Sequence, residues 1–334
     1  MTIFSNFKKY AIVAALVLGV AACSDDDDGN GGNPDISGTI VETAIGDEDL
    51  SSLVAALEKA DLVGILNGPG PFTVLAPTNQ AFANLLDNLN VASLDDLTAE
   101  QLRPVLLNHV IAGKILTAET LTTAGNGYDT TAATYDDGDS DTMNNPALSI
   151  YFTTEGGVTF NGISTVMTAD IRATNGIIHK VDEVITLPTV ATFAVANENL
   201  STLVAALTTL TPSTDFPSIL SRTADESDGI NPPFTVFAPT NDAFAAISVP
   251  TDEAQVAAIL QAHVISGANV RSSMLADVEG DVGTLNGDVT IVANPPTVQG
   301  SDNEDPVEIN TDFVDIQAIN GVIHVVNGVI LPEL

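Results

Sequence analysis

The chain contains two copies of one sequence unit, and this internal repeat restricts its fold more than any other feature. Residues 72–82 read FTVLAPTNQAF and residues 234–244 read FTVFAPTNDAF, with nine of eleven positions identical. Three further blocks return in the same order: LVAAL at 53–57 and 203–207, HVI at 109–111 and 263–265, and NGIIH at 175–179 with NGVIH at 320–324. Ordered blocks over a domain-sized span indicate a tandem duplication of one folding unit.

Within each copy, helical patterns precede β-prone runs. The apolar spacing predicts helices over 47–66 and 98–108 and one that begins after Thr78 or Asn79, with a short strand at 72–75 between them. Further strands are expected at 128–131, 148–152, 158–160, 166–171 and 177–187. Helices that come early and strands that come late predict an α+β unit rather than alternating βαβ elements.

Turns and surface loops are expected between these elements. Asn175-Gly176 and Asn320-Gly321 lie between predicted strands, and Asn-Gly readily takes positive φ at both central positions of a hairpin turn. The two copies differ in length near residues 86–100, 125–145 and 211–233. Insertions are best tolerated in surface loops, so we expect loops there.

The repeated blocks resemble the two signature boxes of the fasciclin (FAS1) family. APTNxAF at 76–82 and 238–244 is similar to the first box, and the segments 170–188 and 315–332, which contain NGIIH and NGVIH, are similar to the second. The resemblance implies two tandem FAS1 domains, residues 38–188 and 189–334, each a β-wedge or sandwich flanked by several helices. It also implies a role in adhesion or extracellular interaction, without enzymatic activity.

One family feature is only half present. Animal relatives use a Tyr-His motif near the middle of the domain for cell adhesion. Here the corresponding positions read Asn108-His109 and Ala262-His263. The histidine is kept and the tyrosine is absent, so integrin binding of the animal type is not carried over.

The first residues have the parts of an export signal. Lys8 and Lys9 precede an apolar run at 11–22, which is shorter than the about 20 residues that a membrane-spanning helix needs. Residues 1–22 are therefore expected to be a signal peptide. The run ends in Val-Ala-Ala-Cys23, which resembles a bacterial lipobox, so Cys23 is the expected lipid attachment site; the alternative is an ordinary signal peptide followed by a chance cysteine. Cys23 is also the only cysteine, so the chain forms no internal disulfide.

Residues 23–37 are polar, acidic and rich in Gly and Asn, and we expect a disordered tether there. The run after Cys23 resembles the acidic signal that directs some Bacteroidetes-type lipoproteins to the outer cell surface. The expected location is therefore the cell envelope, as a surface-exposed outer-membrane lipoprotein that contacts the membrane through its lipid anchor only.

The formal net charge is −35, and removal of residues 1–22 leaves 7 basic and 44 acidic residues, a charge of −37. A field of this sign repels phosphate, which excludes nucleic acid as a partner. Solubility in salt water is one explanation of the acidity, and calcium binding is the other. Asp137, Asp139 and Asp141 alternate within DDGDSD and are the candidate calcium ligands, although a solvated loop is the simpler interpretation. No other cofactor is expected.

Catalytic and metal motifs are absent from the sequence. Four histidines occupy matching positions in the two copies (His109, His179, His263 and His324), but they border or lie in apolar runs and no His-Glu-x-x-His occurs, so buried structural histidines are expected. There is no Gly-x-Ser-x-Gly and no phosphate-binding glycine loop. An extracellular hydrolase therefore remains a minor alternative.

The sequence predicts a cell-envelope binding or adhesion module with two fasciclin domains. The expected partner is an extracellular protein, a matrix polymer or a neighbouring cell surface. The alternative is a ligand carrier or accessory lipoprotein that binds a small molecule or polymer. No recognition residues can be named from the sequence.

Overall fold

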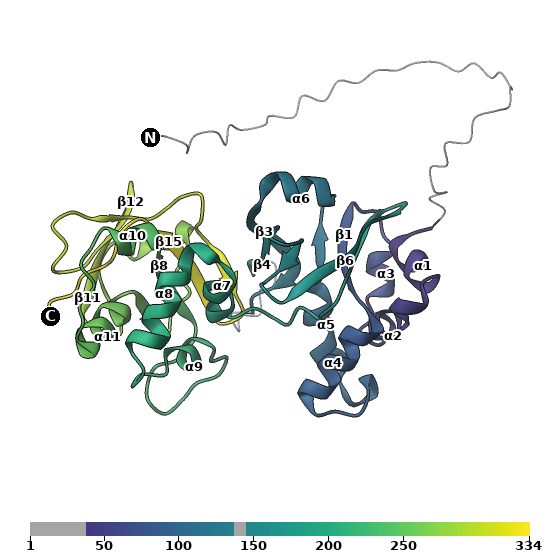
Figure 1. The fold of residues 1–334 in the computed structure, drawn as a ribbon, viewed down its shortest axis with the longest axis horizontal. Coiled ribbons are helices and arrows are strands. Elements are labelled where there is room, and N and C mark those ends of the chain that lie inside the picture. The colour runs from purple at the N-terminus through teal and green to yellow at the C-terminus, as the bar shows by residue number, and fades with distance from the viewer. Residues whose placement is uncertain (1–37, 137–144) are drawn as a thin grey trace, which may run out of the picture. The chain divides into compact units, whose positions relative to one another are not determined.

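The computed structural model describes residues 38–136 and 145–334. The two copies fold with a similar order of elements, and we call the part from α1 to β7 unit 1 and the part from α7 to β15 unit 2 (Figure 1). Cys23, Asp137, Asp139 and Asp141 lie outside the described residues.

Unit 1 begins with helices and ends with strands. Its helical elements are α1 (Ile40–Ile45), η1 (Glu48–Leu50), α2 (Ser51–Lys59), α3 (Val63–Leu66), α4 (Asn79–Leu89), η2 (Leu94–Asp96), α5 (Ala99–Leu107) and α6 (Ala118–Ala124). Its strands are β1 (Phe72–Pro77), β2 (Val110–Ala112), β3 (Asn126–Thr134), β4 (Ala147–Thr153), β5 (Thr159–Phe160), β6 (Ser164–Ala173) and β7 (Gly176–Val181). They form a sheet in the order β2-β1-β7-β6-β5-β4-β3, in which only β1 and β7 pair in parallel.

Unit 2 repeats this plan with its strands divided between two sheets. Its helical elements are α7 (Val190–Ala196), η4 (Glu198–Leu200), α8 (Ser201–Ala205), the π-helical η5 (Ala206–Leu210), α9 (Phe216–Leu220), α10 (Asn241–Ala245), α11 (Glu253–Ala262) and η6 (Ser272–Asp277). One sheet has the order β14 (Ile316–Ala318), β15 (Gly321–Val326), β8 (Phe234–Pro239), β9 (Val264–Ser266). The other has the order β10 (Gly280–Gly283), β11 (Asp288–Ala293), β12 (Pro296–Gln299), β13 (Val307–Glu308).

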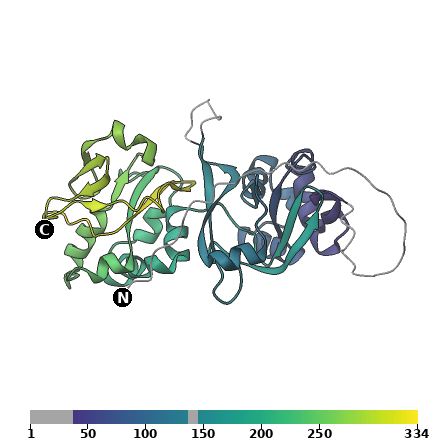
Figure 2. The ribbon, with the colours of Figure 1, turned by 90° about the horizontal axis from the view of Figure 1, so that it is seen from above.

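Local sequence signals start the helices where they are observed. Thr39 caps α1 and Thr98 caps α5, each in a capping box with the residue three positions later. Thr78 caps α4 through its hydroxyl, as predicted. In unit 1 the apolar faces of α1 to α5 pack with β1 and β7 into one core. In both views the first helices, coloured purple, gather beside β1 and β6 and away from β3 and β4 (Figures 1 and 2).

The predicted α+β class is confirmed, with three corrections to its elements. The helix expected over 47–66 is divided into η1, α2 and α3, because Asp61 has φ 54° and the chain turns before Val63. The strand expected over 177–187 ends at Val181. The loop expected over 125–145 contains strand β3, so that part of the loop prediction is wrong.

The Asn-Gly turns are also corrected. The two-residue turns are Thr174-Asn175 and Ile319-Asn320, one position earlier than expected, and neither asparagine has positive φ. Gly176 is already the first residue of β7 and pairs with Phe72. A Cβ at Gly176 would lie 2.2 Å from the Phe72 carbonyl oxygen, so the glycine is needed for the close approach of β1 rather than for the turn.

Among the described residues, no single helix is long and apolar enough to cross a membrane. The segments Val190–Ala196 and Glu198–Leu210 pass a test of length and composition only when taken together, and they are bent by 100° at their break.

Candidate interaction surfaces

His109 and His263 occupy the same place in the two units. Each follows the last turn of a helix, and its Nδ1 lies 2.7 Å from the carbonyl oxygen four residues earlier. Each Nε2 accepts a hydrogen bond of 2.9 Å from a backbone N–H, that of Ile185 in unit 1 and that of Ile330 in unit 2. Nδ1 therefore carries the proton and the ring is neutral. Burial lowers the pKa of both histidines to about 4.

His179 and His324 form a second matched pair with the opposite tautomer. Their Nε2 atoms donate to the carbonyl oxygens of Leu116 and Val270 at 2.7 and 2.8 Å. Their Nδ1 atoms accept from the backbone N–H of the aspartate nine residues earlier, at 3.3 and 3.4 Å. Burial lowers the pKa of both rings.

All four imidazoles are committed to the backbone of their own unit. Each is at most 2% exposed, and both ring nitrogens of each have a hydrogen-bond partner. The expectation of buried structural histidines is confirmed. Asn108, at the position of the absent tyrosine, is fully buried and donates to the carbonyl oxygens of Ile185 and Thr186. This region therefore supports the fold and presents neither side chain to a partner.

The first repeated box is likewise architectural. Asn79 follows the strand-to-helix turn, and its Oδ1 accepts from the Ser52 N–H at 2.8 Å while its Nδ2 donates to the Glu48 carbonyl. Asn241 makes the matching bonds to Thr202 and Glu198 in unit 2. The box thus joins the helix after the strand to the helix before it.

The acidic residues in the described part of the chain do not form a metal site. There, no group of three or more His, Cys, Asp or Glu side chains is arranged to hold a metal ion. The cluster 302–305 is used for a turn, in which Asn303 Oδ1 accepts from the N–H groups of Gly300 and Leu331. The calcium ligands predicted at Asp137, Asp139 and Asp141 lie outside the described residues, so calcium binding stays a prediction.

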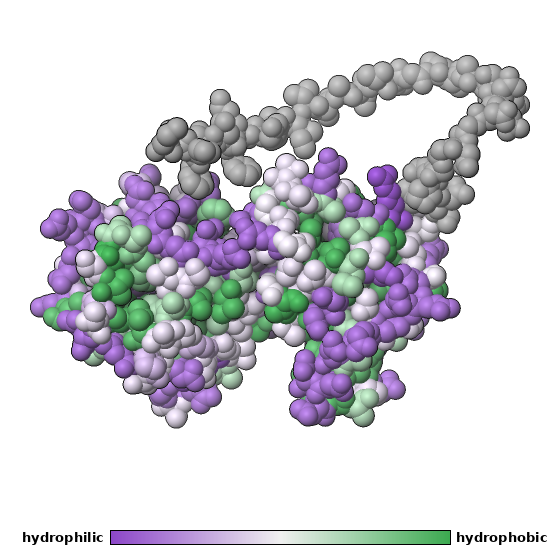
Figure 3. Space-filling view, viewed as in Figure 1, coloured by the Kyte–Doolittle hydropathy of each residue, from purple (hydrophilic) through white to green (hydrophobic). Residues whose placement is uncertain are grey.

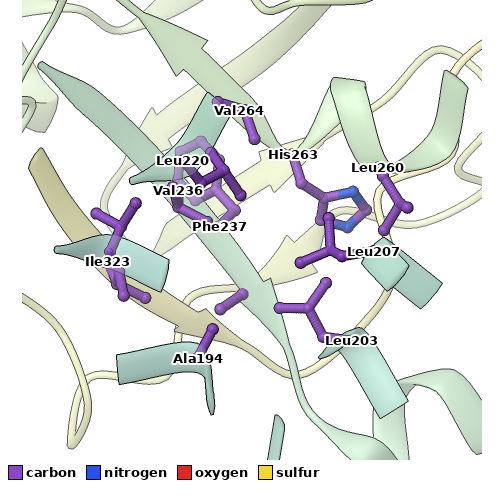
Figure 4. A pocket seen from close by; sticks show the side chains of 12 residues that line it. Ala194, Leu203, Leu207, Leu220, Val236, Phe237, Leu260, His263, Val264 and Ile323 are labelled. Atoms are coloured by element: carbon purple, nitrogen blue, oxygen red, sulfur yellow. The ribbon is translucent and has the colours of Figure 1, made fainter. Parts of the chain in front are cut away.

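Unit 2 contains a small apolar cavity between its helices and its sheet (Figure 4). Its volume is about 20 Å³, and side chains of α7, α8, η5 and α11 line it, with His263 among them. Both nitrogens of His263 are already bonded, so the lining offers only carbon. A volume of this size suits about one water-sized molecule. The cavity is too small to hold the ligand of a carrier protein.

The exposed helical surfaces of the two units differ in charge. Glu58, Lys59 and Arg103 of unit 1 correspond in the repeat to Thr208, Thr209 and Ala257 of unit 2. Figure 3 shows apolar residues, in green, over α10 and α11 of unit 2, whereas hydrophilic residues cover much of α4 in unit 1. The two units share the hydrogen bonds of their histidines and of Asn79 and Asn241, and they differ in charge on their helical surfaces.

Comparison with known proteins decides the family. The family model described as the fasciclin domain matches residues 48–188 and 198–332. The chain belongs to the fasciclin domain family. It is 40% identical to protein sll1483 of Synechocystis over 150 residues, which are 45% of this chain and 74% of that protein. It is 38% identical to a second Synechocystis protein, sll1735, over 44% of this chain and 96% of that protein.

Longer animal proteins also match the fasciclin chain. It is 28% identical to human periostin over 68% of its own length and 24% of periostin. A solved structure of a FAS1 domain pair from the insect cell adhesion molecule fasciclin I aligns over 87% of this chain and 95% of that chain, with 18% identity and a TM-score of 0.46. The two matches of the family model confirm the recognition as a tandem fasciclin protein.

Proposed function

We propose that this protein is a non-enzymatic adhesion or binding module, tethered to the bacterial cell envelope, that presents two fasciclin domains to an extracellular partner. The observation that carries the proposal is the combination, in one chain, of two fasciclin matches over 48–188 and 198–332 with an upstream Val-Ala-Ala-Cys23 that ends an apolar run. A lipid anchor followed by interaction domains is the arrangement of a surface-displayed binding protein.

The anchor half of the proposal rests on sequence. Residues 1–22 act as the signal peptide, Cys23 is acylated, and residues 23–37 connect the anchor to domains at 38–188 and 189–334. The protein resides in the outer membrane with its domains outside the cell. The lipobox-like order of residues and the absence of any other cysteine support this assignment.

The binding half rests on family membership and on the surfaces. The partner is an extracellular protein, a matrix polymer or a neighbouring cell surface. A net charge of −35 disfavours phosphate-rich partners, which supports a protein or neutral polymer over nucleic acid. Because the repeated histidines are buried in the domains, recognition resides in the exposed positions at which the two units differ, such as Glu58 and its counterpart Thr208.

The experiment compares the native protein with a Cys23→Ala variant by intact mass, by partition into detergent, and by protease digestion of whole cells. The proposal predicts a diacyl or triacyl mass on a chain that starts at Cys23, detergent partition, and loss of both domains on external digestion. The variant should lack the lipid and leave the membrane fraction. A native protein that is unlipidated, or that intact cells protect from protease, would contradict the tethered-module proposal.

A further inference from the structure

The surface formed by the first helix and the second box can be compared residue by residue between units 1 and 2, because the first helices of the two units begin alike. Thr39 caps α1 and Thr189 caps α7. The first helical N–H of each donates to an asparagine of the second box, Asn175 in unit 1 and Asn320 in unit 2, at 2.9 Å in both. An offset of 150 residues in the first helix, from Thr39 to Thr189, and of 145 residues in the second box, from Asn175 to Asn320, then pairs the neighbouring positions of the two units.

In unit 2 the surface formed by the α7 region and β14 contacts unit 1. We define the α7–β14 face by Phe193 and Asn197 of the α7 region, Gln317 of β14, and the adjoining Phe313 and Ile319. Phe193 is fully buried, and Asn197 and Gln317 are 7% and 1% exposed. The described residues of both fasciclin domains belong to a single compact unit.

Tyr128 of β3, in unit 1, lies at the centre of the contact. Its ring centroid is 5.7 Å from that of Phe193 and 6.4 Å from that of Phe313, both on the α7–β14 face, and 4.9 Å from that of Tyr151. Asn197 Nδ2 donates to the Tyr128 hydroxyl at 3.1 Å. An aromatic side chain with a bonded hydroxyl is a frequent anchor of interfaces, because one end packs and the other is satisfied by a polar partner.

Further polar contacts fix the orientation of the α7–β14 face on unit 1. The Gln317 N–H donates to Ser149 Oγ of β4 at 2.9 Å, with both residues buried. The Ile319 N–H donates to the carbonyl oxygen of Pro188, where the chain leaves the first domain. Directional bonds at two separate places oppose both sliding and rotation of the face.

The corresponding face of unit 1 has a different composition. Its residues at the places of Phe193, Asn197, Asn199, Phe313, Gln317, Ile319 and Val325 are Thr43, Asp47, Asp49, Thr168, Arg172, Thr174 and Lys180. Lys180 Nζ lies 2.9 Å from Asp47 Oδ2 and 3.2 Å from Asp49 Oδ2, and the side chain of Asp49 is 72% exposed. At the residues that define the α7–β14 face, the unit 1 charges of Asp47 and Arg172 are thus replaced by neutral amides, and three threonines are replaced by Phe, Phe and Ile.

We propose that the α7–β14 face is a dedicated docking surface for strands β3 and β4 of the first domain, so that the two fasciclin domains act as one rigid unit. Buried charges at an interface are costly unless they are paired, whereas buried apolar side chains, and amides that are hydrogen-bonded as Asn197 and Gln317 are, cost much less. The covered copy of the face has uncharged amides, Asn197 and Gln317, where the exposed copy has Asp47 and Arg172, and this is the pattern expected of a permanent interface.

This inference does not depend on the adhesion proposal. It determines whether a partner binds two independent domains or one surface that spans both. Domains that move independently bind a common partner with an avidity set by their linker. Domains held at a fixed angle instead present a preorganised surface that spans both, which lowers the entropy lost on binding.

The test measures the distance between two spin labels on the full-length protein in detergent. Labels are placed at Gln80→Cys in α4 and Gln255→Cys in α11, both exposed, in a Cys23→Ser background. The wild-type interface predicts one narrow distance peak. The double variant N197D/Q317R, which places the unit 1 residues on the α7–β14 face, should lose that peak and show a broad distribution.

The reverse exchange, D47N/R172Q on the face of unit 1, is the matched control and should keep the narrow peak. Tyr128→Ala removes the anchor from the unit 1 side and should also lose it, which keeps the test decisive if N197D/Q317R fails to fold. A broad distribution in the wild type, or a narrow one in both folded interface variants, would overturn the proposal.

Discussion

At the scale of single residues, four histidines hold the backbone of this protein through hydrogen bonds that require neutral rings. His109 and His263 carry the proton on Nδ1, and His179 and His324 carry it on Nε2, because in each case one nitrogen faces a carbonyl and the other faces an N–H. The tautomer is therefore set by the fold.

The first prediction is a two-and-two pattern of tautomers. Long-range ¹H–¹⁵N spectra of the imidazole rings at pH 7 should show Nδ1–H for His109 and His263 and Nε2–H for His179 and His324. Variants with one histidine replaced assign each signal. A set of four identical tautomers, or rapid exchange with charged rings at pH 7, would disagree with the observed bonding.

The second prediction concerns stability in mild acid. The pKa of His109 and of His263 is lowered from 6.5 to about 4 in the folded protein, so below pH 6.5 the unfolded chain binds more protons than the folded one. The contribution of these neutral rings to the free energy of unfolding is fully present above pH 6.5 and is lost as the pH falls. Between pH 6.5 and 5, where most carboxyls stay ionised, each of these rings lowers the free energy of unfolding by about 2 kcal/mol.

Urea unfolding at pH 7, 6 and 5 measures this loss. The transition midpoint should move steadily to lower urea as the pH falls. Since His109 and His263 belong to different domains, a H109M or H263M variant should flatten the pH dependence of one domain while lowering its overall stability. A wild-type midpoint that is unchanged from pH 7 to 5 would contradict the argument.

At the scale of elements, each domain depends on one parallel strand pair, β1–β7 or β8–β15, that brings its first half against its last strand. The start of the second strand approaches the first so closely that only glycine fits. A Cβ at Gly176 or Gly321 would lie 2.2 or 2.1 Å from the carbonyl oxygen of Phe72 or Phe234.

The third prediction follows from this approach. Gly176→Ala should lower the free energy of unfolding by about 1–3 kcal/mol, because β1 and β7 must separate to admit the methyl group. Gly64→Ala in α3 is the control: nothing lies within 4 Å of its Cβ, so the substitution should be neutral or stabilising by up to about 1 kcal/mol. Equal effects of the two changes in chemical denaturation would reject the explanation.

The fourth prediction concerns the asparagine beside that glycine. Asn320 accepts from the Val190 N–H and donates to the carbonyl oxygens of Leu220 and Arg222, so it ties two helices to the β14–β15 turn. Asn320→Ala leaves these buried groups unpaired and should cost roughly 2–4 kcal/mol. Asn327, also followed by glycine but exposed, is the matched control, and Asn327→Ala should change stability by less than about 0.5 kcal/mol.

At the scale of the whole molecule, the duplication was readable because its blocks are core segments and caps, whose residue types are restricted by packing. Thr78 caps the helix that the sequence predicts to begin after Thr78 or Asn79, and the four histidines are buried as expected. The prediction that Gly176 is needed for a hairpin turn is wrong. Glycine is required there because the backbone of Phe72, which is distant in the chain, approaches too closely for a Cβ.

The contact face escaped sequence reasoning for a similar physical reason. Asn197 looks like an ordinary surface amide until its partner Tyr128 is placed beside it, and Gln317 contacts unit 1 through its backbone N–H, which donates to Ser149, while its side-chain amide bonds within unit 2. The available signal was the difference between the copies, in which Asp47 becomes Asn197 and Arg172 becomes Gln317. Such exchanges between otherwise similar copies indicate where the two environments differ.

The proposed function is attachment of the cell that displays this fasciclin protein to an external partner, and attachment can be measured on whole cells. Cells of the bacterium that makes the protein are compared with a deletion strain, and with that strain carrying the wild-type protein or Cys23→Ala. We expect that deletion reduces attachment and biofilm, that the wild type restores them, and that the untethered variant does not. A deletion strain that attaches as well as its parent would overturn the proposed function.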